Sequence, residues 1–427
     1  MKLNKLNILT AIILLLFGVN LYASTIQSTS KAAEGSLKSI LQYALHEDPK
    51  VLEAKANLAS AEAQTKVAKA GHYPSLSIVN TQVLTQKDKN SEHRKFNPTL
   101  RGQLNLYSWG LVESEIEYSK HKEAFFKHKE EETREQVGKT IIEYYLMALR
   151  AKEMITAHQD SLKRHEKILQ KIETMASHDV GRAFEISEAE SRLLQVESSI
   201  EEQSRILDIA LSRLNRFSNK PITAQDIQDP FKNDTNVFIK QYKNEELYKS
   251  NPTFLAQKNE LDSVKANLKA SKAKLLPAIN LQGDLYRGGY QVYLDVSWKI
   301  VDLASYHTVD QYRYTENAAQ AKLQEILLEL QEQARSSEID MRKNNDRLAV
   351  IKKQINTQKQ VVSSVELQFD IAKRSLLDVL NSYRELSSIQ IAEIDIKNDY
   401  RLASMSYLVS QAKVAKWAGI ENIHLKF

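Results

Sequence analysis

The sequence contains no cysteine among its 427 residues. This absence excludes disulfide bonds, a lipid anchor on an amino-terminal cysteine and metal sites built from thiolates. Glycine and proline are also scarce, with 11 and 7 copies, and neither occurs between Gly289 and Gly419, a stretch of 129 residues. Because helices in globular proteins average about a dozen residues, this gap predicts helices of several tens of residues.

Long apolar runs are missing beyond the amino terminus. Lys2 and Lys5 precede the apolar run 8–17, and Ala23 offers a cleavage point, so residues 1–23 are predicted to be a secretory signal peptide. The alternative is an uncleaved anchor helix, although this run is short for a full membrane span. No later run is long enough for a transmembrane helix, so contact with a membrane would require a β-barrel.

The chain also lacks a marked excess of either charge. Without Lys2 and Lys5 it keeps 57 of its 59 basic side chains against 54 acidic ones, and both signs are interspersed along the predicted helices. A nucleic-acid partner would require clustered basic residues, so we predict none. Nucleophile motifs, glycine-rich phosphate loops and carboxylate clusters are absent, and the histidine pairs are seven residues apart, too far for joint chelation. We predict neither an enzyme nor a cofactor nor a metal site.

An internal duplication relates two parts of the chain at an offset of 203 residues. Pro49 corresponds to Pro252 and Pro74 to Pro277, and several leucine, lysine and alanine positions between them also correspond. Proline is tolerated in the first turn of a helix and excluded from its interior. Each copy therefore predicts one helix that ends before the second proline, and the alternating apolar residues that follow predict strands.

The predicted organisation has a first structural repeat at 24–217, a linker or equatorial segment at 218–250, a second repeat at 251–418 and a tail at 419–427. Strands are predicted at about 75–85, 98–109, 278–286 and 290–299. Long helices are predicted at 111–176, 183–217, 302–371 and 375–417, with apolar residues at the three- and four-residue steps typical of packed helices. The predicted fold class is mainly α with a small β part, built from long antiparallel coiled-coil helices.

Four strands are too few to close a membrane barrel, since the smallest have about eight. An open sheet cannot remain in lipid because its edge groups would be unpaired, so several copies would have to share one barrel. Trp109 and Trp298 end the second strand of each pair, with Tyr107 and Tyr293 nearby. Such aromatic residues are typical of a membrane interface, and packing at a strand–helix junction is the alternative.

Two motifs lie at the junctions of the predicted long helices: VGRAFEISEAESRL at 180–193 and KRSLLDVLNSYREL at 373–386. Together with the duplicated prolines and the strand end LYSWG, they resemble the TolC family of outer-membrane channel proteins over nearly the whole chain after the signal. The GR and RSLLD elements are most similar to members that serve type I secretion systems. The resemblance implies a homotrimer in the outer membrane of a Gram-negative bacterium, with a shared twelve-stranded β-barrel and an α-helical tunnel (α-barrel) across the periplasm.

The resemblance also implies a periplasmic aperture that opens when an inner-membrane transporter and its periplasmic adaptor dock. Glu185 and Arg374 correspond to an ion-paired latch between coiled coils. The family pattern is altered at three positions, where Asn381 replaces an acid, Phe369 a tyrosine and Ala372 a glycine, which predicts a weaker or differently built closure. The residues assigned to the aperture are Glu185, Arg374, Asp378, Asn381, Asp370 and Arg182.

The function predicted from the sequence is the outer-membrane exit duct of a type I secretion system, a passive conduit for protein export. One alternative is the outer-membrane component of a tripartite drug or metal efflux pump. An alternative of another class is a soluble periplasmic coiled-coil adaptor or structural protein without a barrel. A neighbouring gene for an ABC exporter would favour the first, and fractionation of the protein with the outer membrane would separate both channels from the third.

Overall fold

The computed structural model describes residues 37–80, 98–231, 234–243 and 246–420. The predicted signal peptide and most of the predicted tail lie outside the described residues. Strands are β1 (Ser75–Asn80), β2 (Pro98–Tyr107), β3 (Ala278–Tyr286) and β4 (Gly289–Ser297). Helices are α2 (Leu37–Glu47), α3 (Pro49–Ala70), α4 (Leu111–Ala176), α5 (Ala183–Asn215), α6 (Thr235–Tyr242), α7 (Leu247–Ser250), α8 (Pro252–Ala273), α9 (Leu303–Asp370), α10 (Leu376–Ser410) and α11 (Val414–Trp417), with a 3-10 turn at Val180–Arg182.

The duplicated prolines begin two helices of equal length, α3 and α8. Each helix is capped by the residue before its proline: Asp48 accepts from the Lys50 N–H at 2.9 Å, and Asn251 accepts from the Thr253 N–H at 3.0 Å. A side-chain oxygen at this position satisfies a backbone donor that the first turn leaves free. Both helices have 22 residues and end just before the second proline of each copy.

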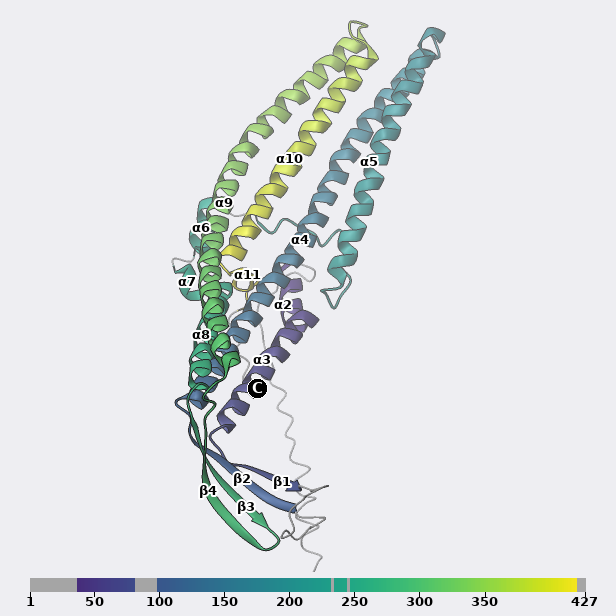
Figure 1. Cartoon of the computed structure of the whole chain (residues 1–427). Coiled ribbons are helices and arrows are strands. Elements are labelled where there is room, and N and C mark those ends of the chain that lie inside the picture. Colours follow the sequence, from purple (N-terminus) through teal and green to yellow (C-terminus); the bar gives the residue numbers. More distant parts are fainter. Residues whose placement is uncertain (1–36, 81–97, 232–233, 244–245, 421–427) are drawn as a thin grey trace, which may run out of the picture. The chain divides into compact units, whose positions relative to one another are not determined.

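The four longest helices form two hairpins, α4 with α5 and α9 with α10 (Figure 1). α8 packs between α4 and α9, whereas α3 packs along α4. One hydrophobic core surrounds the middle of α4 and includes Ile141, Ile142 and Tyr145, while a second core joins α4, α9 and α10 near the hairpin turns. None of the described helices combines the length and apolar content needed to cross a bilayer.

The segment between the two repeats contains the short helices α6 and α7, and it joins the first core through Phe231 and Phe238. The last predicted long helix is also interrupted. α10 ends at Ser410, and α11 follows after Ala412, whose φ of 51° lies in the left-handed region. The Phe231 ring stacks on Trp417 of α11 at 5.3 Å, so this break lets the last described helix close the core.

The strands form one antiparallel sheet in the order β1-β2-β3-β4. The central pair joins the two repeats, with Leu100 of β2 opposite Leu285 of β3 and Arg101 opposite Asp284. A register shift between Asn105 and Tyr107 marks a bulge at the end of β2. β1 and β4 are the edge strands of this sheet, and β1 is described to Asn80, short of the predicted end at about 85.

Candidate functional site

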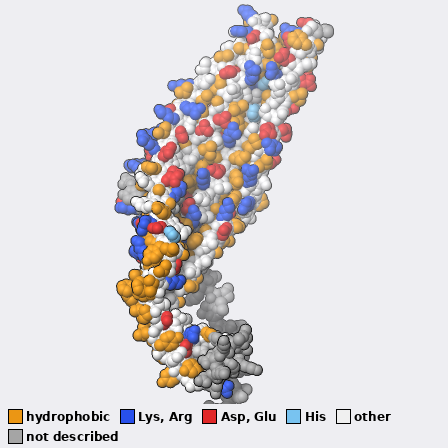
Figure 2. Space-filling view, in the orientation of Figure 1, with side chains coloured by type: hydrophobic (Ala, Val, Ile, Leu, Met, Phe, Trp, Pro, Cys, Tyr) orange, Lys and Arg blue, Asp and Glu red, His pale blue; other side chains and the backbone are white. Residues whose placement is uncertain are grey.

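One face of the sheet is apolar and exposed. On β4, Tyr290, Val292, Leu294 and Val296 are each between 62% and 78% exposed. Because successive side chains of a strand point to opposite faces, these alternating residues lie on one face, in register with apolar residues of β3. Figure 2 shows hydrophobic side chains gathered toward the sheet, whereas the long helices carry interspersed blue and red side chains.

The other face of the sheet is polar and internally hydrogen-bonded. Arg101 donates through Nε to Oδ1 of Asp284 at 2.8 Å, and Gln291 donates to Oδ2 of the same carboxylate at 3.1 Å. The Tyr293 hydroxyl donates to Gln282 Oε1 at 2.7 Å. The sheet is thus amphipathic, with its polar groups paired across strands and its apolar groups unpartnered.

The two tryptophans predicted at the strand ends occupy equivalent places. Trp109 donates through Nε1 to the Pro277 carbonyl at 2.9 Å, and Trp298 donates to the Leu275 carbonyl at 3.1 Å. Their rings are 48% and 58% exposed, and Tyr107 packs edge-on against Trp109 at 5.2 Å. Each indole therefore has its polar N–H tied to the backbone and its apolar surface largely uncovered, an arrangement suited to an interface.

At the first hairpin turn, Arg182 ends the 3-10 turn and Glu185 lies in the first turn of α5. Arg182 Nη1 lies 3.7 Å from Glu185 Oε2, and Arg182 Nε lies 3.7 Å from Asp179 Oδ2. The Glu185 side chain is only 18% exposed, and its Oε2 atom is buried without a hydrogen-bond partner among the described residues. This carboxylate is therefore incompletely satisfied within one copy of the chain.

The second hairpin turn begins α10 with a capping box. The Ser375 hydroxyl accepts from the Asp378 N–H at 3.2 Å, and Asp378 Oδ2 accepts from the Ser375 N–H at 3.0 Å. These bonds from Ser375 lower the pKa of the Asp378 carboxyl. Just before them, Ala372 has a φ of 59°, the left-handed conformation that favours glycine. Asp378 is thus engaged in starting the helix.

Arg374 is half exposed and does not contact Glu185. It donates through Nε to Gln368 Oε1 at 3.0 Å, and its Nη1 lies 3.8 Å from Asp378 Oδ1. Within the described part of a single chain, no ion pair joins Arg374 to Glu185. The predicted latch between these residues stays a prediction.

The structure brings a different pair together across the hairpins: Lys171 of α4 forms an ion pair with Asp370 of α9. Farther from the turns, Arg150 of α4 pairs with Asp395 of α10 at 2.7 Å. Sequence reasoning named Asp370 without its partner and missed Arg150, because charged residues recur all along these helices. The arrangement can hold the two hairpins together by electrostatic attraction.

Phe369 and Asn381, the two other positions that differ from the family pattern, lie in different environments. Phe369 is 3% exposed and packs in the second core, so an apolar ring here contributes to packing of the hairpin end. Asn381 is exposed and lines a cavity between α4, α5 and α10. Neither residue supplies charge to the hairpin end.

A buried guanidinium ties the segment after α5 to the long helices. Arg401 of α10 is 3% exposed and donates to both carboxylate oxygens of Glu153, at 2.7 and 2.8 Å. It also donates to Asp229 Oδ2 at 2.8 and 3.1 Å. One bidentate and one shared contact satisfy this charge, a role that no local sequence pattern indicates.

A second carboxylate holds α11. Glu135 of α4 accepts from the Val414 N–H at 3.0 Å and from the Ala415 N–H at 3.2 Å. Burial raises the pKa of Glu135 to about 7, partly offset by these two hydrogen bonds. The contact is therefore poised to titrate near neutral pH.

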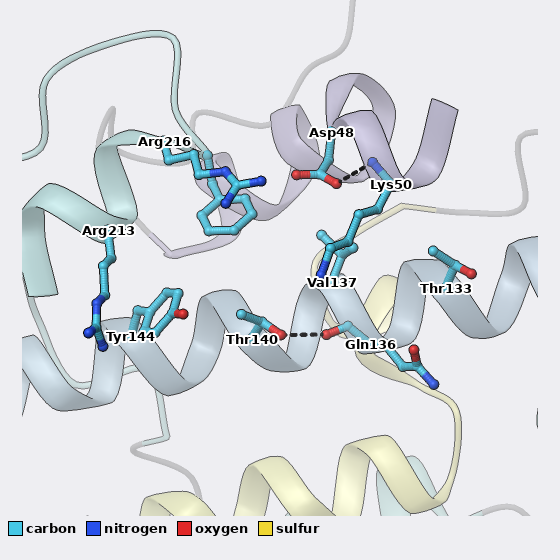
Figure 3. A pocket seen from close by; sticks show the side chains of 10 residues that line it. Asp48, Lys50, Thr133, Gln136, Val137, Thr140, Tyr144, Arg213 and Arg216 are labelled. Carbon is cyan, nitrogen blue, oxygen red and sulfur yellow. Dashed lines mark hydrogen bonds between the residues drawn. The ribbon is translucent and has the colours of Figure 1, made fainter. Parts of the chain in front are cut away.

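Figure 3 shows a cavity of about 230 Å³ near the ends of α5 and α2. Several of its polar groups are already engaged: Asp48 caps α3, and the Thr140 hydroxyl donates to the Gln136 carbonyl at 3.0 Å. The Arg213 guanidinium lies over the Tyr144 ring at 5.3 Å. No group of three or more potential metal ligands occurs among the described residues.

The sequence and the architecture are both similar to those of known proteins. Residues 40–220 match the family model described as outer membrane efflux protein. The CmeC outer membrane channel of Campylobacter jejuni has a TM-score of 0.75 at 15% identity, covering 91% of this chain and 90% of that chain. The outer membrane protein VceC of Vibrio cholerae has a TM-score of 0.76 at 13% identity, covering 88% and 96%. The open state of the MtrE outer membrane channel of Neisseria gonorrhoeae has a TM-score of 0.74 at 15% identity, covering 88% and 89%. No curated protein sequence matches the chain significantly.

The fold is that of the outer membrane channels CmeC and MtrE. The match of residues 40–220 to the outer membrane efflux protein model and the shared fold confirm the resemblance to TolC-family channels that the sequence indicated. The predicted mainly helical fold with four strands is confirmed as well. At these identities the solved structures establish the fold alone.

Proposed function

We propose that the chain is the outer-membrane exit duct of a type I secretion system in a Gram-negative bacterium. Three copies form a homotrimer in which twelve strands close a β-barrel in the outer membrane and the long helices form the wall of a tunnel across the periplasm. The duct performs no chemistry. An ABC transporter in the inner membrane supplies the energy and reaches the duct through a periplasmic adaptor.

The main support for a tunnel wall shared between copies is that equivalent helices of the two repeats are covered to different extents. α8 lies between α4 and α9, whereas the equivalent helix α3 has only α4 as a long neighbour. Three positions of α3 are therefore exposed while their equivalents in α8 are at most 7% exposed. These pairs are Ala63 and Ala266, Val67 and Ala270, and Ala70 and Ala273. A second copy that places its α9 against α3 would repeat the contact already made inside the chain.

The edges of the sheet support the same arrangement of neighbouring copies. Among the described strands, β1 and β4 are the edge strands, and the same step that covers α3 would bring β4 of one copy beside β1 of the next. An apolar face toward lipid and a polar face toward the lumen is the pattern of membrane barrels. Trp109, Trp298, Tyr107 and Tyr293 would then lie at the level of the membrane interface.

The absence of cysteine permits a direct test of this assembly. Val67→Cys introduces a thiol on the proposed interface, and Lys66→Cys is the matched control, because Lys66 and its equivalent Lys269 are both exposed. We expect the Val67→Cys thiol to react slowly with a maleimide in the assembled protein and rapidly after dissociation, while the control reacts rapidly in both states. Equal reactivity in a monodisperse single copy would contradict the shared wall.

The type I assignment is supported by the GR and RSLLD elements at the hairpin turns. The family description instead names efflux, which favours the second candidate, a tripartite drug or metal efflux pump. Affinity capture of cross-linked complexes from the native bacterium separates the two. Recovery of an ABC transporter with its adaptor supports type I secretion, and recovery of a proton-driven pump supports efflux. Mature protein found only in the soluble periplasmic extract would refute both.

We also propose that the hairpin turns form the periplasmic aperture. The incompletely satisfied carboxylate of Glu185 and the half-exposed Arg374 support a latch between neighbouring copies. Arg182 would position Glu185, and Asp378 and Asn381 would lie on the following turns of α10. Asp370 would contribute through its pairing with Lys171 inside each copy.

A further inference from the structure

A cavity of about 280 Å³ with a mixed polar and apolar lining lies where α4, α5 and α10 meet. His158, Ser161 and His165 of α4 line it at steps of three and four residues, so they share one face of that helix. Arg192 faces the cavity from α5 and Arg384 from α10, with Asn381 one turn before Arg384. We refer to this space as the inter-hairpin cavity, because its lining comes from both hairpins.

The inter-hairpin cavity is lined by positive charge without negative charge among its described residues. None of the described residues that line it is a carboxylate, and two are guanidinium groups. Arg192 donates to Gln195 Oε1 at 3.3 Å rather than to an acid. Arg384 forms no ion pair with any carboxylate in the described ranges. Two cations on facing walls without a local anion repel each other, so the site favours an added negative charge.

Neutral polar side chains also line the cavity, together with the apolar residues Val196, Leu380 and Ile391. Ser161 is 1% exposed, and its hydroxyl has no hydrogen-bond partner among the described residues. His165 is 4% exposed, its Nδ1 lies 2.9 Å from the Ser161 carbonyl, and its ring packs edge-on against Tyr383. Burial lowers the pKa of His165, and the guanidinium groups of Arg164 and Arg192 lower it further. The buried histidine thus adds no fixed charge that would replace the missing anion.

We propose that the inter-hairpin cavity binds a small, multiply charged oxyanion, with Arg192 and Arg384 as its main ligands. Planar guanidinium groups bind phosphate and carboxylate oxygens through paired, charge-assisted hydrogen bonds. Pockets for drug-sized ligands measure roughly 300–1,000 Å³, so a cavity of this volume suits a phosphate-sized or short dicarboxylate anion with a few waters. The anion would link α5 of one hairpin to α10 of the other. This inference does not depend on which cargo the channel carries.

The test is a calorimetric titration of the purified full-length protein in detergent with inorganic phosphate and, separately, with malonate. Sodium chloride keeps the ionic strength constant. We expect saturable binding of at least one anion, and the comparison of the two identifies whether tetrahedral or carboxylate oxygens are preferred. Loss of a charged hydrogen-bonding group should weaken binding by about ten- to one-hundredfold in Arg192→Gln and Arg384→Gln.

The matched control is Arg205→Gln, because Arg205 lies on the same helix α5, outside the cavity, and pairs with Glu202 at 2.7 Å. It should bind as the unmodified protein does. Arg384→Lys keeps the charge and loses the planar fork, so intermediate affinity with an unchanged melting temperature shows that the loss is not misfolding. Absence of saturable heat with both anions, or equal affinity in the two Gln variants and the unmodified protein, would overturn the proposal.

Discussion

The ion pair between Lys171 and Asp370 gives a direct test of the proposed aperture, because it joins α4 to α9 near the hairpin turns. Their side chains are 39% and 43% exposed, so the pair belongs with surface salt bridges, which contribute about 0.2–1 kcal/mol. In the proposed homotrimer, three pairs that break together would contribute about 0.6–3 kcal/mol, or a roughly 3- to 150-fold shift in the ratio of open to closed channels.

We expect Lys171→Glu alone, or Asp370→Lys alone, to raise the open fraction by at least this factor, because each places like charges side by side. The double variant restores opposite charges and should return toward the unmodified value. Single-channel recording in planar bilayers measures the open fraction directly. A double variant as open as either single variant, or single variants that gate normally, would refute the role of this pair.

Three further predictions concern other parts of the helical structure. Ala372→Gly should raise the unfolding free energy by about 0.5 kcal/mol in denaturant titration, because glycine adopts a positive φ without steric cost but loses more entropy on folding; an Ala372→Val variant should be less stable. Arg401→Met should lower the free energy of unfolding by about 2 kcal/mol. This is less than the loss of a fully buried ion pair would cost, because Glu153 and Asp229 are each 27% exposed. An unchanged midpoint of the denaturant titration would contradict this prediction. Because the pKa of Glu135 is raised in the folded state to about 7, the folded chain holds an extra proton between about pH 4.5 and pH 7. The free energy of unfolding should therefore fall as pH rises through this range and then level off. Glu135→Gln should remove this slope in melting temperature measured against pH, and a slope that persists would assign it to other groups.

Much of the helical architecture could be predicted because it depends on local chemistry. Proline at 49 and 252 disfavours a helical conformation at the residue before it, and a new helix begins at each proline with a capping side chain. The 129-residue gap in glycine and proline covers α9 and α10, interrupted at a turn where Ala372 adopts a positive φ without glycine. Alternation also located the strands, since one face of the sheet is apolar.

The parts that could not be predicted depend on contacts between distant segments. Lys171 meets Asp370, and Arg401 meets Asp229, only because helix packing sets their relative register, which no local pattern encodes. The break before α11 has a similar origin. Ala412 adopts a left-handed conformation that its own side chain disfavours, and the packing of Trp417 against Phe231 compensates for it.

The RSLLD element has a structural role at the start of α10, and this role limits what the element indicates about cargo. Ser375 and Asp378 are the two partners of the capping box that begins α10. Loss of a Ser cap costs about 1 kcal/mol, so Ser375→Ala should fray the first turn of α10 and change the conductance of the proposed aperture. It should leave the captured inner-membrane transporter the same, because these side chains are bonded to the turn itself. Capture of a different transporter by Ser375→Ala would show that the turn takes part in partner choice.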